Sequence, residues 1–233
     1  MDTCMDGSPL RRIDPQECVC LFDMDNTLYN FVDAKKAACM QAAQRIGTGD
    51  GMELFRYFLR DIHGFEHHDN IRDFMEDRGI RDSAVFEDAC RDYDTVKLAL
   101  IDPYPGVPDT LERLKAAGVK MAVVTDAESS HAYRRLEKVG IRGYFESVIT
   151  PDVSGKRKPA HDSFLMALES LGSAPEQAWI VGDSLHREIR PGNELGMTTV
   201  HAVYGDWTGT PCPSVTPTYV LHSFSDLLRY MGL

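Results

Sequence analysis

Short apolar runs, each followed by a polar loop and an amphipathic segment, recur along most of this chain. The runs cover residues 18–22, 121–124, 147–150 and 179–181, with weaker ones at 198–203 and 219–221. Runs of this length are typical of buried strands and too short for most helices. The segments between them carry apolar residues at helical spacing, as with Leu111 and Leu114 before Gly118. This alternation predicts an α/β fold with a doubly wound parallel sheet covered by helices on both faces.

The alternation is interrupted once, between residues 29 and 102, where only helical patterns occur. A Pro-rich stretch, residues 102–106, then returns the chain to the strand pattern. We therefore predict a core of residues 1–28 and 103–233 with an α-helical insertion over residues 29–102. Within the insertion, we expect Lys35 and Lys36 to lie on a solvated helix face. Its aromatic residues are expected to pack in a core; they include Phe55, Tyr57, Phe58 and Phe74.

The charge balance excludes several classes of partner. The chain has 25 Lys and Arg against 36 Asp and Glu, a formal net charge of −11. Such a chain is a poor platform for nucleic acid or an anionic membrane surface. No apolar run approaches the roughly 18 residues of a transmembrane helix, and the polar Met1–Pro15 segment does not resemble a secretory signal. The six cysteines show no metal-binding spacing, so we expect reduced thiols in a cytoplasmic protein. The sequence leaves the oligomeric state open.

Polar residues gather where the predicted strands end, which is where ligands bind in open α/β sheets. The four groups are Asp23 with Asp25, Thr125 with Asp126, Lys158, and Asp183 with Glu188. Two carboxylates two residues apart suit a nucleophile beside a general acid and base, or oxygen ligands for a divalent cation. A turn that caps the next helix would also explain the first pair. Lys158 could neutralise a phosphoryl group, and a solvated basic loop is the alternative.

The order and spacing of these groups resemble the four motifs of the haloacid-dehalogenase (HAD) superfamily. Asp23-x-Asp25-x-Thr27 matches the first motif, and Thr125 the second. Lys158-Pro159 matches the third motif, and Gly182-Asp183-x4-Glu188 the fourth. The resemblance implies a Rossmann-like core, with the inserted helices as a cap of the C1 type.

The resemblance also implies roles for the residues that match the motifs. Asp23 would attack phosphorus and form an aspartyl-phosphate. Asp25 would protonate the leaving oxygen and then activate the water that hydrolyses the intermediate. Thr125 and the backbone amides around Met24 and Asp126 would bind the phosphoryl oxygens.

A cation and a metal site complete the implied set. Lys158 would offset the negative charge of Asp23 and the phosphoryl group. Mg²⁺ would be the cofactor, held by the carboxylates of Asp23 and Asp183 and by the backbone carbonyl of Asp25. Glu188 would support the metal through water or orient Lys158.

Asp25 favours a phosphatase over a dehalogenase, because dehalogenases of this superfamily attack carbon and lack that acid. A helical cap implies a small phosphorylated metabolite as substrate, such as a nucleotide, phosphoglycolate or a sugar phosphate. Two alternatives stay open. One is a phosphomutase of the β-phosphoglucomutase type, and the other is a non-catalytic interaction protein on the same fold.

Overall fold

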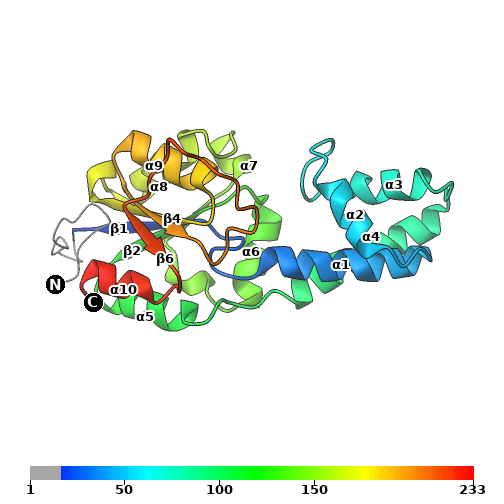
Figure 1. Ribbon diagram of the computed structural model, residues 1–233. Coiled ribbons are helices and arrows are strands. Elements are labelled where there is room, and N and C mark those ends of the chain that lie inside the picture. Colours follow the sequence, from blue (N-terminus) through cyan, green and yellow to red (C-terminus); the bar gives the residue numbers. More distant parts are fainter. Residues whose placement is uncertain (1–16) are drawn as a thin grey trace. The chain divides into compact units, whose positions relative to one another are not determined.

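The computed structural model describes residues 17–233; Cys4 and the Met1–Pro15 segment lie outside this range. Its core is one sheet of six parallel strands in the order β3-β2-β1-β4-β5-β6 (Figure 1). The strands are β1 Val19–Phe22, β2 Lys120–Val124, β3 Ser147–Ile149, β4 Ala178–Gly182, β5 Thr198–Ala202 and β6 Tyr219–Leu221. The chain builds outward from β1 on one side, then crosses to the other. The carboxyl end of β1, between β2 and β4, is therefore the switch point at which such sheets form a crevice.

Helices cover both faces of this sheet, which confirms the predicted doubly wound fold (Figure 1). They are α5 Val107–Ala116, α6 Ser129–Lys138, α7 Pro151–Ser154, α8 Asp162–Leu171, α9 Arg190–Leu195 and α10 Asp226–Met231, with short helical turns η1 Arg142–Tyr144, η2 Pro175–Gln177 and η3 Leu185–Ile189. Alternate side chains of a strand point to opposite faces. Val19 and Leu21 accordingly join the cluster under α8, while the Phe22 ring contacts that of Phe224 next to α10. All four residues of β1 are buried, as the apolar run predicted.

The predicted insertion forms a compact helical unit of its own. Contacts divide the chain into Phe31–Ile101 and the remainder, where the boundaries expected from the sequence are residues 29 and 102. The inserted helices are α1 Phe31–Ile46, α2 Gly51–Phe58, α3 Asp69–Glu76 and α4 Ser83–Ala99. The unit has a separate apolar core that includes Phe55, Phe58 and Phe74, with Tyr57 packed against it. These aromatic side chains pack as the sequence predicted.

One prediction for the insertion is wrong. Lys35 does not lie on a solvated face but is completely buried in α1. Its ammonium group donates a hydrogen bond to the carbonyl of Phe65 and lies 4.1 Å from the ring centroid of Phe58. The rings that receive Lys35 come from other segments of the unit, so the pattern of α1 alone did not reveal them. Lys36 is partly exposed and forms an ion pair with Asp33 at 3.2 Å.

Two further predictions can be compared with residues 17–233. Cys18, Cys20, Cys39 and Cys90 are buried free thiols, and Cys212 is partly buried, also as a free thiol. In the described part of the chain, no helix is both long enough and apolar enough to cross a bilayer.

Candidate active site

Asp23 is the first residue after β1, and its backbone and side chain are both held in place. Its amide donates to the carbonyl of Val181 in β4 at 2.9 Å, so the loop starts tied to the neighbouring strand. The hydroxyl of Thr27 donates to one carboxylate oxygen of Asp23 at 2.8 Å. Between them Asn26 adopts φ +67°, a left-handed conformation that asparagine tolerates better than most residues. The Asp23 carboxylate is thereby presented at the switch point of the sheet.

Lys158 lies beside Asp23 although the two are far apart in sequence. Its ammonium group is 2.5 Å from Asp23 Oδ1 and 2.8 Å from Glu188 Oε1, and it also donates to the carbonyl of Val124. The lysine and Glu188 side chains are fully buried. Burial alone would lower the pKa of Lys158, but the charges of Asp23 and Glu188 outweigh it and raise this pKa. Lys158 is therefore held as a cation against the carboxylate of Asp23.

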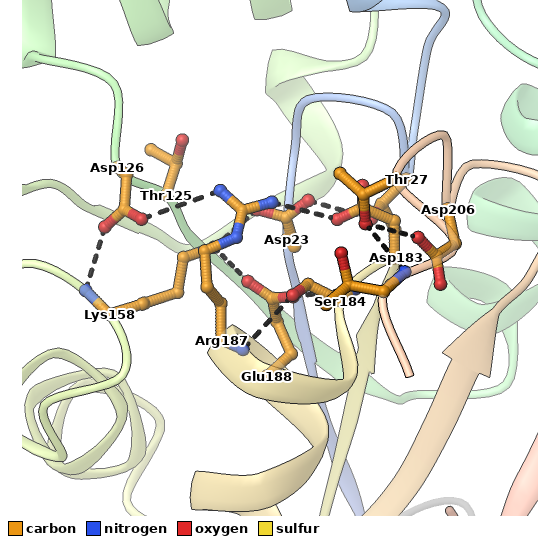
Figure 2. A network of polar contacts seen from close by, with 12 residues as sticks. Asp23, Thr27, Thr125, Asp126, Lys158, Asp183, Ser184, Arg187, Glu188 and Asp206 are labelled. Atoms are coloured by element: carbon orange, nitrogen blue, oxygen red, sulfur yellow. Dashed lines mark hydrogen bonds and ion pairs between the residues drawn. The ribbon is translucent and has the colours of Figure 1, made fainter. Parts of the chain in front are cut away.

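Glu188 is placed by the π-helical turn η3 that follows β4. One of its carboxylate oxygens accepts the amide of Ser184 at 3.0 Å, while the other faces Lys158. A Cβ on Gly182 would lie 2.4 Å from Glu188 Cγ, so glycine is required for the glutamate to pack there. Glu188 therefore contacts Lys158 directly. In Figure 2 the two side chains meet next to Asp23.

A set of carboxylates at the same point fits a divalent cation. Asp23, Asp183 and Glu188 each offer an oxygen, and these oxygens lie within 4.8 Å of one another. Burial, followed by the negative charges of Asp23 and Glu188, raises the pKa of Asp183 well above its usual range. A cation with oxygen ligands would stabilise the ionised form of Asp183, and Mg²⁺ prefers such ligands. The residues present therefore fit a magnesium ion.

Arg187 is part of the site, and the sequence interpretation missed it. Its guanidinium lies 3.2 Å from Asp183 Oδ1 and 3.7 Å from Asp126 Oδ2, between the two carboxylates (Figure 2). Burial acts against its charge, but the charges of Glu188 and Asp183 outweigh burial and raise the pKa of Arg187 further. The available signal was a basic residue inside the fourth motif, next to the expected Glu188.

Thr125 and Asp126 close the site from the end of β2. The amide of Thr125 donates to Ile149 O, and its hydroxyl oxygen accepts the amide of Ala127 at 3.2 Å. The Asp126 carboxylate accepts the backbone amide of Lys158 at 2.9 Å, which ties the lysine segment to this loop. The structure thus brings Thr125 and Asp126 to the same end of the sheet as Asp23 and Lys158.

Asp25 is held by a residue that the sequence interpretation also missed. Arg135 of α6 donates to Asp25 Oδ2 at 2.7 Å, although 110 positions separate the two residues. The Arg135 side chain is 4% exposed and that of Asp25 is 20% exposed. A signal was present in the sequence: Arg135 shares helical spacing with Ala132 and Leu136, both buried, so it lies on the inward face of α6.

This arrangement agrees with the comparison to known families. The model of haloacid dehalogenase-like hydrolases matches residues 20–202, most of the chain. The chain belongs to the haloacid dehalogenase-like hydrolases.

Several members of this family of hydrolases resemble the chain over most of its length. It is 32% identical to a glyceraldehyde 3-phosphate phosphatase of Methanocaldococcus jannaschii, over 80% of this chain and 85% of that protein. It is 29% identical to phosphoglycolate phosphatase 1 of Pseudomonas aeruginosa, over 89% of this chain and 77% of that protein. The solved structure of the HAD-hydrolase YfnB of Bacillus subtilis, bound to magnesium, has the same fold. The two superpose with a TM-score of 0.73, with 19% identity over 96% of this chain and all of that one.

Proposed function

We propose that this hydrolase is a magnesium-dependent phosphatase that acts on a small phosphomonoester through an aspartyl-phosphate. The observation that carries the proposal is the environment of Asp23. Its carboxylate is held by Thr27 and Lys158 at the end of β1, beside the carboxylate of Asp183. No packing requirement explains four charged or polar groups buried together at this point. Phosphoryl transfer does, because it depends on positioning and on neutralising charge.

In the first half of the proposed reaction, an Asp23 oxygen bonds to phosphorus while the ester P–O bond breaks. Asp25 gives its proton to the departing oxygen, which leaves as an alcohol. Lys158 offsets the negative charge of the carboxylate and the phosphoryl group. Thr125 and the amides near Met24 and Asp126 bind the phosphoryl oxygens, as the family motifs imply.

In the second half, water attacks phosphorus of the aspartyl-phosphate and gives a proton to Asp25. Inorganic phosphate leaves, and the free carboxylate of Asp23 is restored. Splitting the reaction in this way lets Asp25 act in both halves, first as an acid and then as a base.

The proposed magnesium ligands are the carboxylates of Asp23 and Asp183 with the backbone carbonyl of Asp25. When bound, the ion would neutralise charge on the phosphoryl oxygens. Glu188, which contacts Lys158 at 2.8 Å, orients that lysine.

The proposed substrates are small phosphorylated metabolites. The relatives named above include a glyceraldehyde 3-phosphate phosphatase and a phosphoglycolate phosphatase. These two compounds therefore head a panel that also contains nucleotides and sugar phosphates. A phosphomutase would reveal itself in this panel by moving phosphate within one sugar with little net phosphate release.

The proposal is tested by phosphate release from the panel and from p-nitrophenyl phosphate, with Mg²⁺ and with a chelator. We expect turnover only with Mg²⁺, and a loss of at least about 10³-fold in kcat for Asp23→Asn. Asp88→Asn removes a half-exposed carboxylate in α4, which pairs with Arg91 of the same helix, and serves as the control, with wild-type kcat. An Asp23→Asn enzyme as fast as wild type would exclude the aspartyl-phosphate mechanism.

A further inference from the structure

We propose that Arg135 is a positioning residue for the carboxylate of Asp25. The inference rests on the proposed function, because it assigns a role to the residue that holds the acid and base of that reaction. It begins from the contact of 2.7 Å between Arg135 Nη1 and Asp25 Oδ2.

The unequal exposure of the two partners is the first argument. The side chain of Arg135 is 4% exposed, whereas that of Asp25 is 20% exposed. The guanidinium therefore supports Asp25 from the protein side, while part of the Asp25 side chain stays exposed and its other carboxylate oxygen, Oδ1, is buried. A purely structural ion pair at the surface would leave both partners accessible, and such pairs contribute little to stability.

The second argument is the limited freedom that remains to Asp25. The backbone after it is held by the hydrogen bond from Asn26 N to Tyr29 O at 2.9 Å. The backbone hydrogen bond does not fix the side-chain torsions of Asp25. The charge-assisted hydrogen bond from Arg135 restricts these torsions directly. Arg135 thus restrains the Asp25 side chain from a helix outside the loop.

The third argument is the rigidity of the helix that carries Arg135. Ala132 and Leu136, on the same face of α6, are completely buried. A site built on a helix packed in this way is held more precisely than one built on a loop. Placing a reacting group about 1 Å out of position can cost about 10²-fold in rate.

The helix also offers a matched control. Arg134 is exposed and precedes Arg135 in the same turn, so Arg134→Met removes an identical charge from the surface. The test measures kcat and KM for p-nitrophenyl phosphate with Mg²⁺ in wild type, Arg134→Met, Arg135→Met, Asp25→Asn and the double variant of the last two. Thermal melting checks that each variant is folded.

We expect Arg135→Met to lower kcat by about 10²-fold, with KM changed less than about threefold. Arg134→Met should match wild type. In the Asp25→Asn background, Arg135→Met should change kcat by less than about twofold, because a group that acts through Asp25 has nothing left to position. A structural role would lower activity equally in both backgrounds.

Wild-type kcat in Arg135→Met, or a full additional loss in the double variant, would overturn the role of Arg135. If Arg135→Met does not fold, Arg135→Lys is compared in the same two backgrounds. A lysine keeps the charge without the planar guanidinium, so its smaller loss should also vanish in Asp25→Asn. An Asp25→Asn enzyme with wild-type kcat would contradict the role of Asp25 itself. An impaired Asp25→Asn with an unimpaired Arg135→Met would contradict only the positioning role.

Discussion

Each compact unit contains a lysine whose side chain is completely buried, Lys158 in the core unit and Lys35 in the helical unit, and these two lysines have opposite surroundings. Lys158 of the core unit contacts the carboxylates of Asp23 and Glu188 at 2.5 and 2.8 Å. Lys35 of the helical unit donates to a backbone carbonyl and lies 3.5 and 4.1 Å from the ring centroids of Phe65 and Phe58. One lysine therefore balances buried negative charge, and the other is accommodated by aromatic rings.

The difference separates a reactive site from a packing arrangement. Around Lys158, the charges of Asp23 and Glu188 keep the lysine ionised, as its raised pKa reflects. Removing one member leaves the others buried without compensation, which is strongly destabilising. Around Lys35, the rings contribute a cation–π attraction and apolar contacts. An apolar side chain of similar length can therefore replace Lys35 and keep most of its contacts, whereas at position 158 it would keep none of the charge interactions.

The largest difference expected between the two lysines follows from exchanging each of them for methionine. Lys158→Met should lower kcat by at least about 10²-fold and destabilise the protein by roughly 3 kcal/mol. Lys35→Met should change the free energy of unfolding by less than about 2 kcal/mol and leave kcat within about threefold. Steady-state kinetics and chemical denaturation measure both quantities. Equal losses of kcat in the two variants would contradict the contrast between the sites.

The same contrast explains what the sequence could predict. The strands and most site residues follow from local patterns, because a strand of buried residues ending in Asp23 or Asp183 is visible in a few consecutive letters. The surroundings of Lys35 are not local: Phe58 and Phe65 come from α2 and from a following loop. A lysine in a helical pattern is normally exposed, and only tertiary packing overrides that expectation.

The two missed arginines differ in the same way. Arg187 lies within the fourth motif and could have been included with Glu188. The helical spacing predicts that Arg135 lies on the inward face of α6. It does not identify Asp25 as the partner of Arg135, because spacing within a helix says nothing about a distant loop. Pairing across the fold is therefore the information that the sequence lacked.

A second comparison concerns two glycines, Gly205 in the core and Gly51 in the helical unit, each of which lies close to another segment of the backbone. A Cβ on Gly205 of the core would lie 1.7 Å from the carbonyl oxygen of Asn26, and one on Gly51 of the helical unit would lie 2.3 Å from Met40 Cα. Both alanine variants should be destabilised by about 1–3 kcal/mol, because neither backbone can move freely. Only Gly205→Ala should also lower kcat, about tenfold, because it displaces the residue next to Asp25.

Gly143→Ala is the control for both glycine variants. A Cβ on Gly143 has no atom within 4 Å, so the stability of this variant should stay within about 0.5 kcal/mol of wild type. Thermal melting and steady-state kinetics suffice. A Gly51→Ala variant that loses as much kcat as Gly205→Ala would show that the helical unit controls the chemistry as directly as the core loop does.

The smallest effect concerns pH and belongs to the helical unit. His68 lies 2.9 Å from Asp94, and hydrogen bonds to Asp94 and Cys90 raise its pKa from 6.5 to about 10. A raised pKa in the folded state stabilises the fold below pH 6.5, and this contribution is lost as the pH rises through about 10. Both side chains are 40% exposed, so we expect the pair to contribute about 0.5–1 kcal/mol to the free energy of unfolding.

Hydrogen exchange of amides in α3 and α4 should therefore become faster between pH 6.5 and 10, beyond its intrinsic pH dependence. His68→Gln should abolish the excess, whereas His67→Gln, at a more exposed position, should retain it. If the excess survives in His68→Gln, another titratable group causes the pH response, and the His68–Asp94 pair does not contribute to it.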